Sequence, residues 1–236
     1  MNQKPRDLLA AVSDFQRKDR FVFLFVGLLL LLIIGPMLEQ SNRSREFLAA
    51  ITSLILLSGV YSSLKESAWL LLTMLFLTAL NLLTVWWEYA SWSMHVALVH
   101  YLGLTIFFFL MVVIILRQIS RETSVNRNVI YGAVTVYLLL AFTWGLLFAT
   151  LFLLEPQSFR NVTVPVSSQF SPVPFWYVSF FTITTLGYSD VAPASDLAKS
   201  LAMIEAVVGQ LYLVLQVSLL VGLRVSEVAA RRHEKK

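Results

Sequence analysis

The sequence contains no cysteine among its 236 residues, which excludes disulfide-stapled folds and cysteine-ligated metal sites. Charged residues are also scarce, at 14%, whereas hydrophobic residues make up 58% of the chain. The mean hydropathy is +0.74. A single soluble core does not bury that much apolar surface, so the composition predicts an all-α integral membrane protein.

Further absences argue against enzymes and transporters. The sequence has no glycine-rich phosphate loop, no His-Glu-x-x-His and no Gly-x-Ser-x-Gly, so we expect neither an enzyme nor a bound cofactor. A secondary transporter typically has two corresponding halves with matched broken helices, whereas one interrupted region is visible here. His95 and His100 have no carboxylate at metal-ligand spacing, and we expect them to be ordinary interfacial residues.

Apolar segments dominate what remains. A helix crosses about 30 Å of hydrocarbon with about 20 mostly apolar residues. The sequence predicts six such spans and one shorter re-entrant segment between the last two. The predicted spans are Phe21 to Leu38, Glu46 to Tyr61, Ala68 to Trp87, His95 to Leu116, Val129 to Leu154 and Leu197 to Arg224.

Basic residues set the predicted orientation, because cytoplasmic loops carry an excess of Lys and Arg. With the amino terminus inside, all but four of the 18 Lys and Arg residues fall on the inner side. The four exceptions are Arg43, Arg45, Arg160 and Lys199. The sequence therefore predicts a multi-pass protein of the cell membrane, plasma or inner, with both termini in the cytoplasm. The net charge is +4, and the Lys and Arg residues cluster beside the spans. This distribution indicates membrane lipids, and not nucleic acid, as the partner.

The re-entrant segment carries the most informative pattern. Residues 173 to 184 form a predicted aromatic helix entered through Pro172 and Pro174, which suit a first helical turn. This helix is too short to cross the bilayer, so the chain turns back in the string Thr-Thr-Leu-Gly-Tyr-Ser-Asp, residues 184 to 190. Backbone that is not helical is tolerated at membrane depth where protein encloses it or where it lines a water-filled path. The pattern therefore predicts a pore.

The last hundred residues resemble the potassium channel family. The resemblance combines an outer helix, the short aromatic helix, the string at 184 to 190 and an inner helix containing Glu-Ala-Val-Val-Gly-Gln at 205 to 210. It implies a homotetramer in which four copies of the string form one selectivity filter. In such a filter, rings of carbonyl oxygens replace the hydration shell of K+. The filter residues implied are Thr185, Leu186, Gly187, Tyr188 and Ser189, with K+ bound at the first four.

Two positions depart from the family pattern. Leu186 stands where valine is usual, a change of packing more than of chemistry. Ser189 stands where the family has a second glycine with a left-handed backbone, and an L-residue there costs on the order of 1 to 2 kcal/mol. The prediction is a potassium-selective channel, and the alternative is a weakly selective or non-selective monovalent cation channel.

Four residues are expected to support the filter: Thr184, Tyr177, Asp190 and Glu205. Tyr177 is the predicted hydrogen-bond partner of Asp190, because relatives often have a polar aromatic residue there. Glu205 lies within a span, where an ionisable group indicates a functional role. For Glu205 we expect a structural bond behind the filter, and the alternative is direct contact with ions.

The inner helix contains a predicted gating hinge, Gly209, at the position where the family often has glycine. Leu213, Val217 and Val221 follow it at four-residue steps and therefore share one helix face. This stripe is a candidate for the pore lining and for an apolar constriction that closes by dewetting. The alternative is that the stripe packs on the outer helix.

The predicted organisation is that of tetrameric voltage-gated-like channels, with a pore domain at 129–225 behind a four-helix, sensor-like domain at 21–117. Residues 118–128 are the predicted cytoplasmic linker and 226–236 the cytoplasmic tail. Residues 1–20 are predicted to be a cytoplasmic amphipathic segment, with a solvated charged leader as the alternative. The fourth span has no Arg or Lys between Leu98 and Leu116, so we expect a channel without voltage gating.

Overall fold

The computed structural model of the protein describes residues 20–38, 44–64, 66–90, 93–122, 125–162, 170–187 and 190–233. Side chains at several segment ends, among them those after Val225, are not described. The amphipathic segment predicted before Arg20 therefore lies outside the described residues. The elements are α2 (Arg20–Leu38), α3 (Ser44–Ser63), α4 (Ala68–Ala90), α5 (Met94–Ser120), α6 (Arg127–Leu154), η1 (Pro156–Ser158), β1 (Phe159–Arg160), α7 (Val173–Ile183), β2 (Ala192–Pro193) and α8 (Asp196–His233).

Five of the six predicted spans reach membrane-spanning length among the described residues. They are Glu46–Ser63, Ala68–Val85, Met94–Ser120, Arg127–Leu154 and Asp196–Val225. The apolar part of α2, Phe21–Met37, is shorter than the 18 residues that the other spans reach. Leu24 and Leu28 on one face of α2 are buried, while Phe23 and Ile33 on the other are exposed and equally apolar. Such a helix, apolar on all sides, suits a lipid environment.

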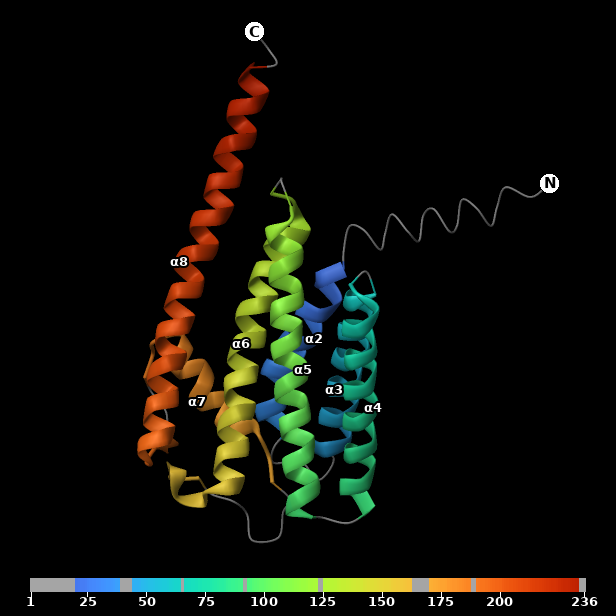
Figure 1. Ribbon diagram of the computed structural model, residues 1–236. Coiled ribbons are helices and arrows are strands. Elements are labelled where there is room, and N and C mark those ends of the chain that lie inside the picture. Colours follow the sequence, from blue (N-terminus) through green and yellow to red (C-terminus); the bar gives the residue numbers. More distant parts are fainter. Residues whose placement is uncertain are drawn as a thin grey trace, which may run out of the picture.

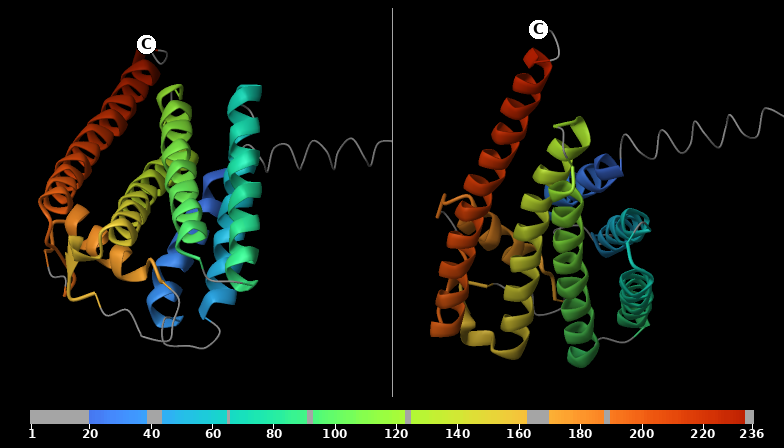
Figure 2. Two further views of the ribbon diagram at one scale, coloured as in Figure 1. Left: turned by 60° about the horizontal axis from the view of Figure 1, so that its bottom comes forward. Right: turned by 45° about the horizontal axis from the view of Figure 1, so that its top comes forward.

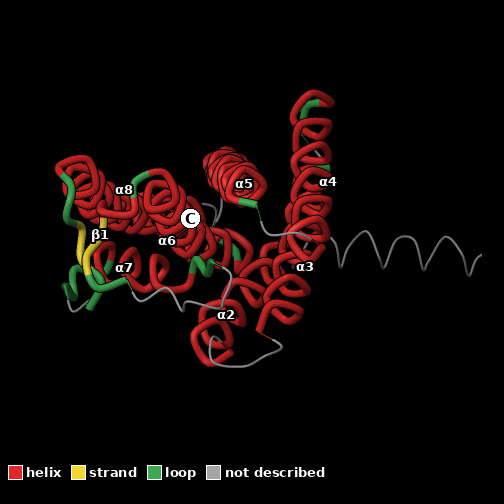
Figure 3. The backbone as a smooth tube through the Cα atoms, turned by 90° about the horizontal axis from the view of Figure 1, so that it is seen from below, coloured by secondary structure: helices red, strands yellow, loops and turns green. Residues whose placement is uncertain are grey.

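The helices are arranged around the antiparallel pair α5 and α6. These two lie side by side in the middle of the molecule, with α2, α3 and α4 on one side and α7 and α8 on the other (Figures 1 and 3). Both helices extend into the predicted 118–128 linker, because α5 ends at Ser120 and α6 begins at Arg127. The Asn126 side chain fixes the start of α6 by accepting a hydrogen bond from the Val129 N–H at 3.0 Å.

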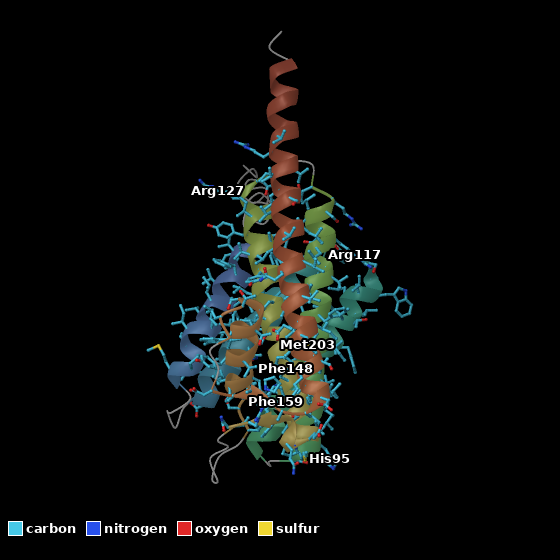
Figure 4. The ribbon with its side chains drawn as sticks, turned by 90° about the vertical axis from the view of Figure 1, so that its left-hand side faces the viewer. His95, Arg117, Arg127, Phe148, Phe159 and Met203 are labelled. Atoms are coloured by element: carbon cyan, nitrogen blue, oxygen red, sulfur yellow. The ribbon has the colours of Figure 1, made fainter. Side chains whose placement is uncertain are left out.

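The short helix α7 is anchored to α6 by a close backbone approach and by aromatic rings. A Cβ atom on Gly145 would lie 2.9 Å from the Trp176 Cα, so only glycine allows α6 and α7 to come this near. The Phe142 ring meets the rings of Trp176 and Phe180 edge to face at 5.2 Å and 5.1 Å. Phe148 and Phe159 lie beside α7 (Figure 4), with ring centroids 5.4 Å apart.

The long helix α8 extends beyond the ends of the other helices toward its carboxyl end (Figure 2). Within Asp196–Val225, 11% of the residues are buried, compared with 78% in α6. The exposed surface of α8 is largely apolar, so it is available to lipid or to other copies of the chain.

One expectation about the histidines is wrong. His95 is exposed near one end of the molecule (Figure 4), as an interfacial residue would be. His100, in contrast, is buried, and its Nδ1 shares a hydrogen bond of 3.0 Å with the Thr84 Oγ1. A turn of helix separates the two residues, and it carries His100 from the surface to the α4–α5 contact.

The close approach at Gly145 generates a stability prediction. Gly145→Ala overpacks the α6–α7 contact and is expected to lower the free energy of unfolding by about 1–3 kcal/mol. Gly222→Ala is the matched control, because a Cβ there meets no atom within 4 Å. Helical Gly→Ala without a clash is expected to stabilise by roughly 0.5–1 kcal/mol. Thermal denaturation in mild detergent checks both, and equal effects of the two changes would contradict the packing described.

Candidate functional site

The string after α7 folds into a turn with two left-handed residues. Helix α7 ends at Ile183, and Thr184, Thr185, Leu186 and Gly187 are exposed. Gly187 has a φ of 72°, which glycine adopts without steric cost. Thr185 has a φ of 61°, which is uncommon for a β-branched residue and stores strain. The other filter residues of the sequence prediction, Tyr188 and Ser189, lie outside the described residues.

The backbone N–H groups of residues 184–187 all point back to the last turn of α7. The bonds run from Thr184 to the Phe180 carbonyl at 3.1 Å, from Thr185 to Thr182 at 3.0 Å, from Leu186 to Phe181 at 3.0 Å and from Gly187 to Phe181 at 3.2 Å. These bonds satisfy carbonyls that a helix end otherwise leaves without partners. The backbone N–H groups of residues 184–187 therefore attach this segment to the end of α7.

The carbonyl groups of the same four residues accept no hydrogen bond from any described residue. The four residues themselves are exposed in the single chain. The carboxyl end of α7 adds the negative end of a helix dipole to this position. Uncompensated carbonyl oxygens beside a negative helix end attract cations and offer them ligands.

Residues 190–194, at and after the end of the string, are hydrogen-bonded to residues 158–161, which follow α6. Strand β1 pairs antiparallel with β2, and the Ala194 N–H donates to the Ser158 carbonyl at 2.7 Å. The Asn161 side-chain amide donates to the Asp190 carbonyl at 3.0 Å. Sequence reasoning missed Asn161. Its φ of 62° belongs to the left-handed region, which asparagine tolerates better than most residues.

The expected bond between Tyr177 and Asp190 is not formed among the described residues. Tyr177 lies on the exposed face of α7, where its ring packs on Phe181 with centroids 4.2 Å apart. Phe181 is one helical turn further along the same face, which explains the pairing. Asp190 is exposed, and its backbone carbonyl is bonded to Asn161 instead.

Glu205 lies behind the string and contacts α7. The carboxyl group is fully buried on α8 and hydrogen-bonded to the Ser179 hydroxyl. The Ser179 Oγ is also 2.6 Å from the Ala141 carbonyl on α6, so the three helices α6, α7 and α8 are joined at one point.

The hydrogen count at this junction bears on the protonation state of Glu205. A serine hydroxyl has one hydrogen to donate. If Ser179 donates it to the Ala141 carbonyl, then the Glu205 carboxyl must supply the hydrogen of the second bond. The other carboxyl oxygen, Oε2, is buried and has no hydrogen-bond partner among the described residues. A carboxylate without a cation in this apolar setting is costly, so the geometry fits a protonated, neutral Glu205.

Gly209 is buried against the end of α7. A Cβ at this position would lie 2.3 Å from the Ile183 Cγ1, so glycine is required for the close approach of α8 to α7. Helix α8 continues through Gly209 as one element, and the hinge remains a prediction. Leu213, Val217 and Val221 are exposed and not buried against α6.

The bond between Ser179 and Glu205 generates a second stability prediction. Ser179→Ala removes the described partner of the buried Glu205 carboxyl, and also the additional bond to the Ala141 carbonyl, and is expected to cost about 1–3 kcal/mol of unfolding free energy. Glu205→Gln keeps a neutral side chain that donates to Ser179, so we expect stability close to that of the wild type. Ser200→Ala, at an exposed position of α8, is the control. Thermal denaturation is the measurement, and a loss on Glu205→Gln as large as on Ser179→Ala would indicate an ionised carboxyl.

Comparisons with known proteins bear on the carboxyl-terminal part of the chain. The model of a family described as "Ion channel" matches residues 129–223, which include α6, α7, the string and most of α8. No match was found among curated proteins or among solved structures. The matched segment is thus similar to ion channels, and this similarity supports ion conduction by the part of the chain that contains the uncompensated carbonyls.

Proposed function

We propose that four copies of the chain form a potassium channel that conducts K+ passively across the cell membrane. The observation that carries the proposal is the hydrogen-bonding pattern of residues 184–187. Their N–H groups bond to α7, and their carbonyls have no hydrogen-bond partner among the described residues. A dehydrated cation needs that arrangement, because carbonyl oxygens must replace its water ligands. The "Ion channel" match over residues 129–223 supports the coarser part of the proposal, passive ion conduction.

Four copies are needed because one strand supplies one carbonyl at each level and does not enclose an ion. Fourfold symmetry supplies a ring at each level, and closed rotational symmetry is the common form of homo-oligomers. The apolar surface of α8, which is mostly exposed in one chain, is available for these contacts. We include α2 as a sixth span, with both termini in the cytoplasm.

Selectivity for K+ is the finer part of the proposal. Thr185, Leu186 and Gly187 contribute three carbonyl rings, and Tyr188 contributes a fourth in the resemblance on which the assignment rests. Ser189 in place of glycine favours the alternative, a weakly selective cation channel, because it alters the outermost ring. Leu213, Val217 and Val221 line the pathway below the filter in this proposal.

Reversal potentials distinguish the two candidates. We expect the purified protein in planar bilayers, under opposed gradients of K+ and Na+ with both ions on each side, to reverse near the K+ equilibrium potential. Ser189→Gly is expected to keep or sharpen this preference, because the resemblance implies a left-handed backbone at this position, where an L-residue costs on the order of 1 to 2 kcal/mol. Gly222→Ala, at an open position of α8, is the control.

A reversal potential near zero in mixed K+ and Na+ would favour the non-selective channel. The absence of cation current from a folded, reconstituted protein would contradict both candidates. Loss of selectivity on Ser189→Gly would contradict the account of the strain.

A further inference from the structure

Three helices meet at the last residue of α7. Ile183 is fully buried, and its side chain fills the space that Gly209 leaves open on α8. Its backbone carbonyl accepts a hydrogen bond of 3.1 Å from the Tyr137 hydroxyl on α6. The string begins at the next residue, so a displacement of Ile183 also displaces the string.

The bond from Tyr137 completes the hydrogen bonding of the α7 carboxyl end. The carbonyls of Phe180, Phe181 and Thr182 accept from the N–H groups of the string. The Ile183 carbonyl is the next in line, and its partner comes from a different helix. Without it, a buried carbonyl loses its partner at the position where the string is attached.

Tyr212 on α8 holds Tyr137 in place. The two rings lie face to face, with centroids 6.1 Å apart and planes inclined by 21°. The Tyr212 hydroxyl donates to the Ala133 carbonyl at 2.6 Å. Ala133 is one helical turn before Tyr137. Tyr212 therefore contacts the same turn of α6 through its ring and through its hydroxyl.

Gly209 and Tyr212 are three residues apart on α8 and therefore neighbours on its surface. Gly209 contacts Ile183 directly, whereas Tyr212 acts on Ile183 through Tyr137. A displacement of α8 at this level breaks the ring contact and the bond to Ala133 together. Tyr137 then loses its support, and the Ile183 carbonyl loses its donor.

We infer that Tyr137 and Tyr212 form a latch that fixes the inner end of the ion-binding string according to the position of α8. Both are positioning residues: Tyr137 acts on the Ile183 carbonyl, and Tyr212 acts through Tyr137. The role in conduction rests on the proposed function, whereas the effect on the string does not. The latch makes the string a place where movement of α8 changes conduction.

Hydrogen–deuterium exchange on the full-length protein in lipid nanodiscs tests the latch without reference to conduction. Tyr137→Phe keeps the ring and removes the donor, so we expect the amides of residues 184–187 to exchange about fivefold faster, the effect of one neutral hydrogen bond. Tyr212→Phe is expected to act in the same direction. The double variant is expected to match Tyr137→Phe alone, because the two hydroxyls act in series.

Tyr131→Phe is the matched control, since Tyr131 lies on the same helix, is exposed, and its hydroxyl has no hydrogen bond among the described residues. Exchange unchanged by Tyr137→Phe, or changed equally by Tyr131→Phe, would overturn the latch. Additive effects of the two substitutions would overturn the serial arrangement.

Single-channel recordings separate the latch from the proposed function. If the wild type conducts, Tyr137→Phe and Tyr212→Phe are expected to change the open probability by about fivefold, whereas the open probability of the Tyr131→Phe control is expected to match that of the wild type. Conduction by the wild type with no change in either variant would overturn the gating role. If the wild type does not conduct while exchange accelerates as expected, the proposed function fails and the latch stands.

Discussion

The structure depends on how the backbone polar groups at the end of α7 are satisfied. In a hydrocarbon environment, a backbone group without a partner costs several kcal/mol, so each donor and acceptor must be accounted for. The N–H groups of residues 184–187 are bonded to α7, and the last carbonyl of α7 is bonded to Tyr137. This leaves a consecutive set of carbonyls without hydrogen-bond partners among the described residues. Such a set is stable only if water or a cation supplies what the protein does not.

Polar side chains on α6, α7 and α8 serve this arrangement. Ser179 joins α7 to the Ala141 carbonyl of α6 and to Glu205 of α8, and the two tyrosines join the same helices at Ile183. Hydrogen bonds between helices are a main source of specificity in membranes, where apolar contacts alone do not distinguish protein from lipid. The position of α7 is therefore defined from behind by directional bonds, and from the side by the ring of Phe142 and the close approach at Gly145.

Much of this arrangement follows from local sequence, and the remainder does not. Pro172, the length of the apolar run and the polar string after it predict a short helix over 173–184, and the structure has α7 over Val173–Ile183. The glycine at 187 has the left-handed backbone that favours this residue type. Apolar length likewise predicts the long spans, although α2 is shorter than the spanning length reached by the others.

Hydrogen bonds between residues that are far apart in the chain leave no pattern in the local sequence. Asn161 and Asp190 are separated by 29 positions, and Tyr137 and Ile183 by 46, so neither bond is visible in the sequence. The same reason explains the Tyr177–Asp190 bond that we expected and that is not formed among the described residues. His100 was misplaced because its apolar neighbours do not reveal which helix face is buried.

The central claim is that the carbonyls of residues 185–187 from four chains coordinate a dehydrated cation on a common axis. Anomalous diffraction from crystals of the full-length protein grown in Tl+, a heavy analogue of K+, tests it most directly. The account predicts anomalous peaks on a fourfold axis at the levels of the Thr185, Leu186 and Gly187 carbonyls. Tetramers without axial peaks, or chains whose carbonyls at these positions face no common axis, would contradict it.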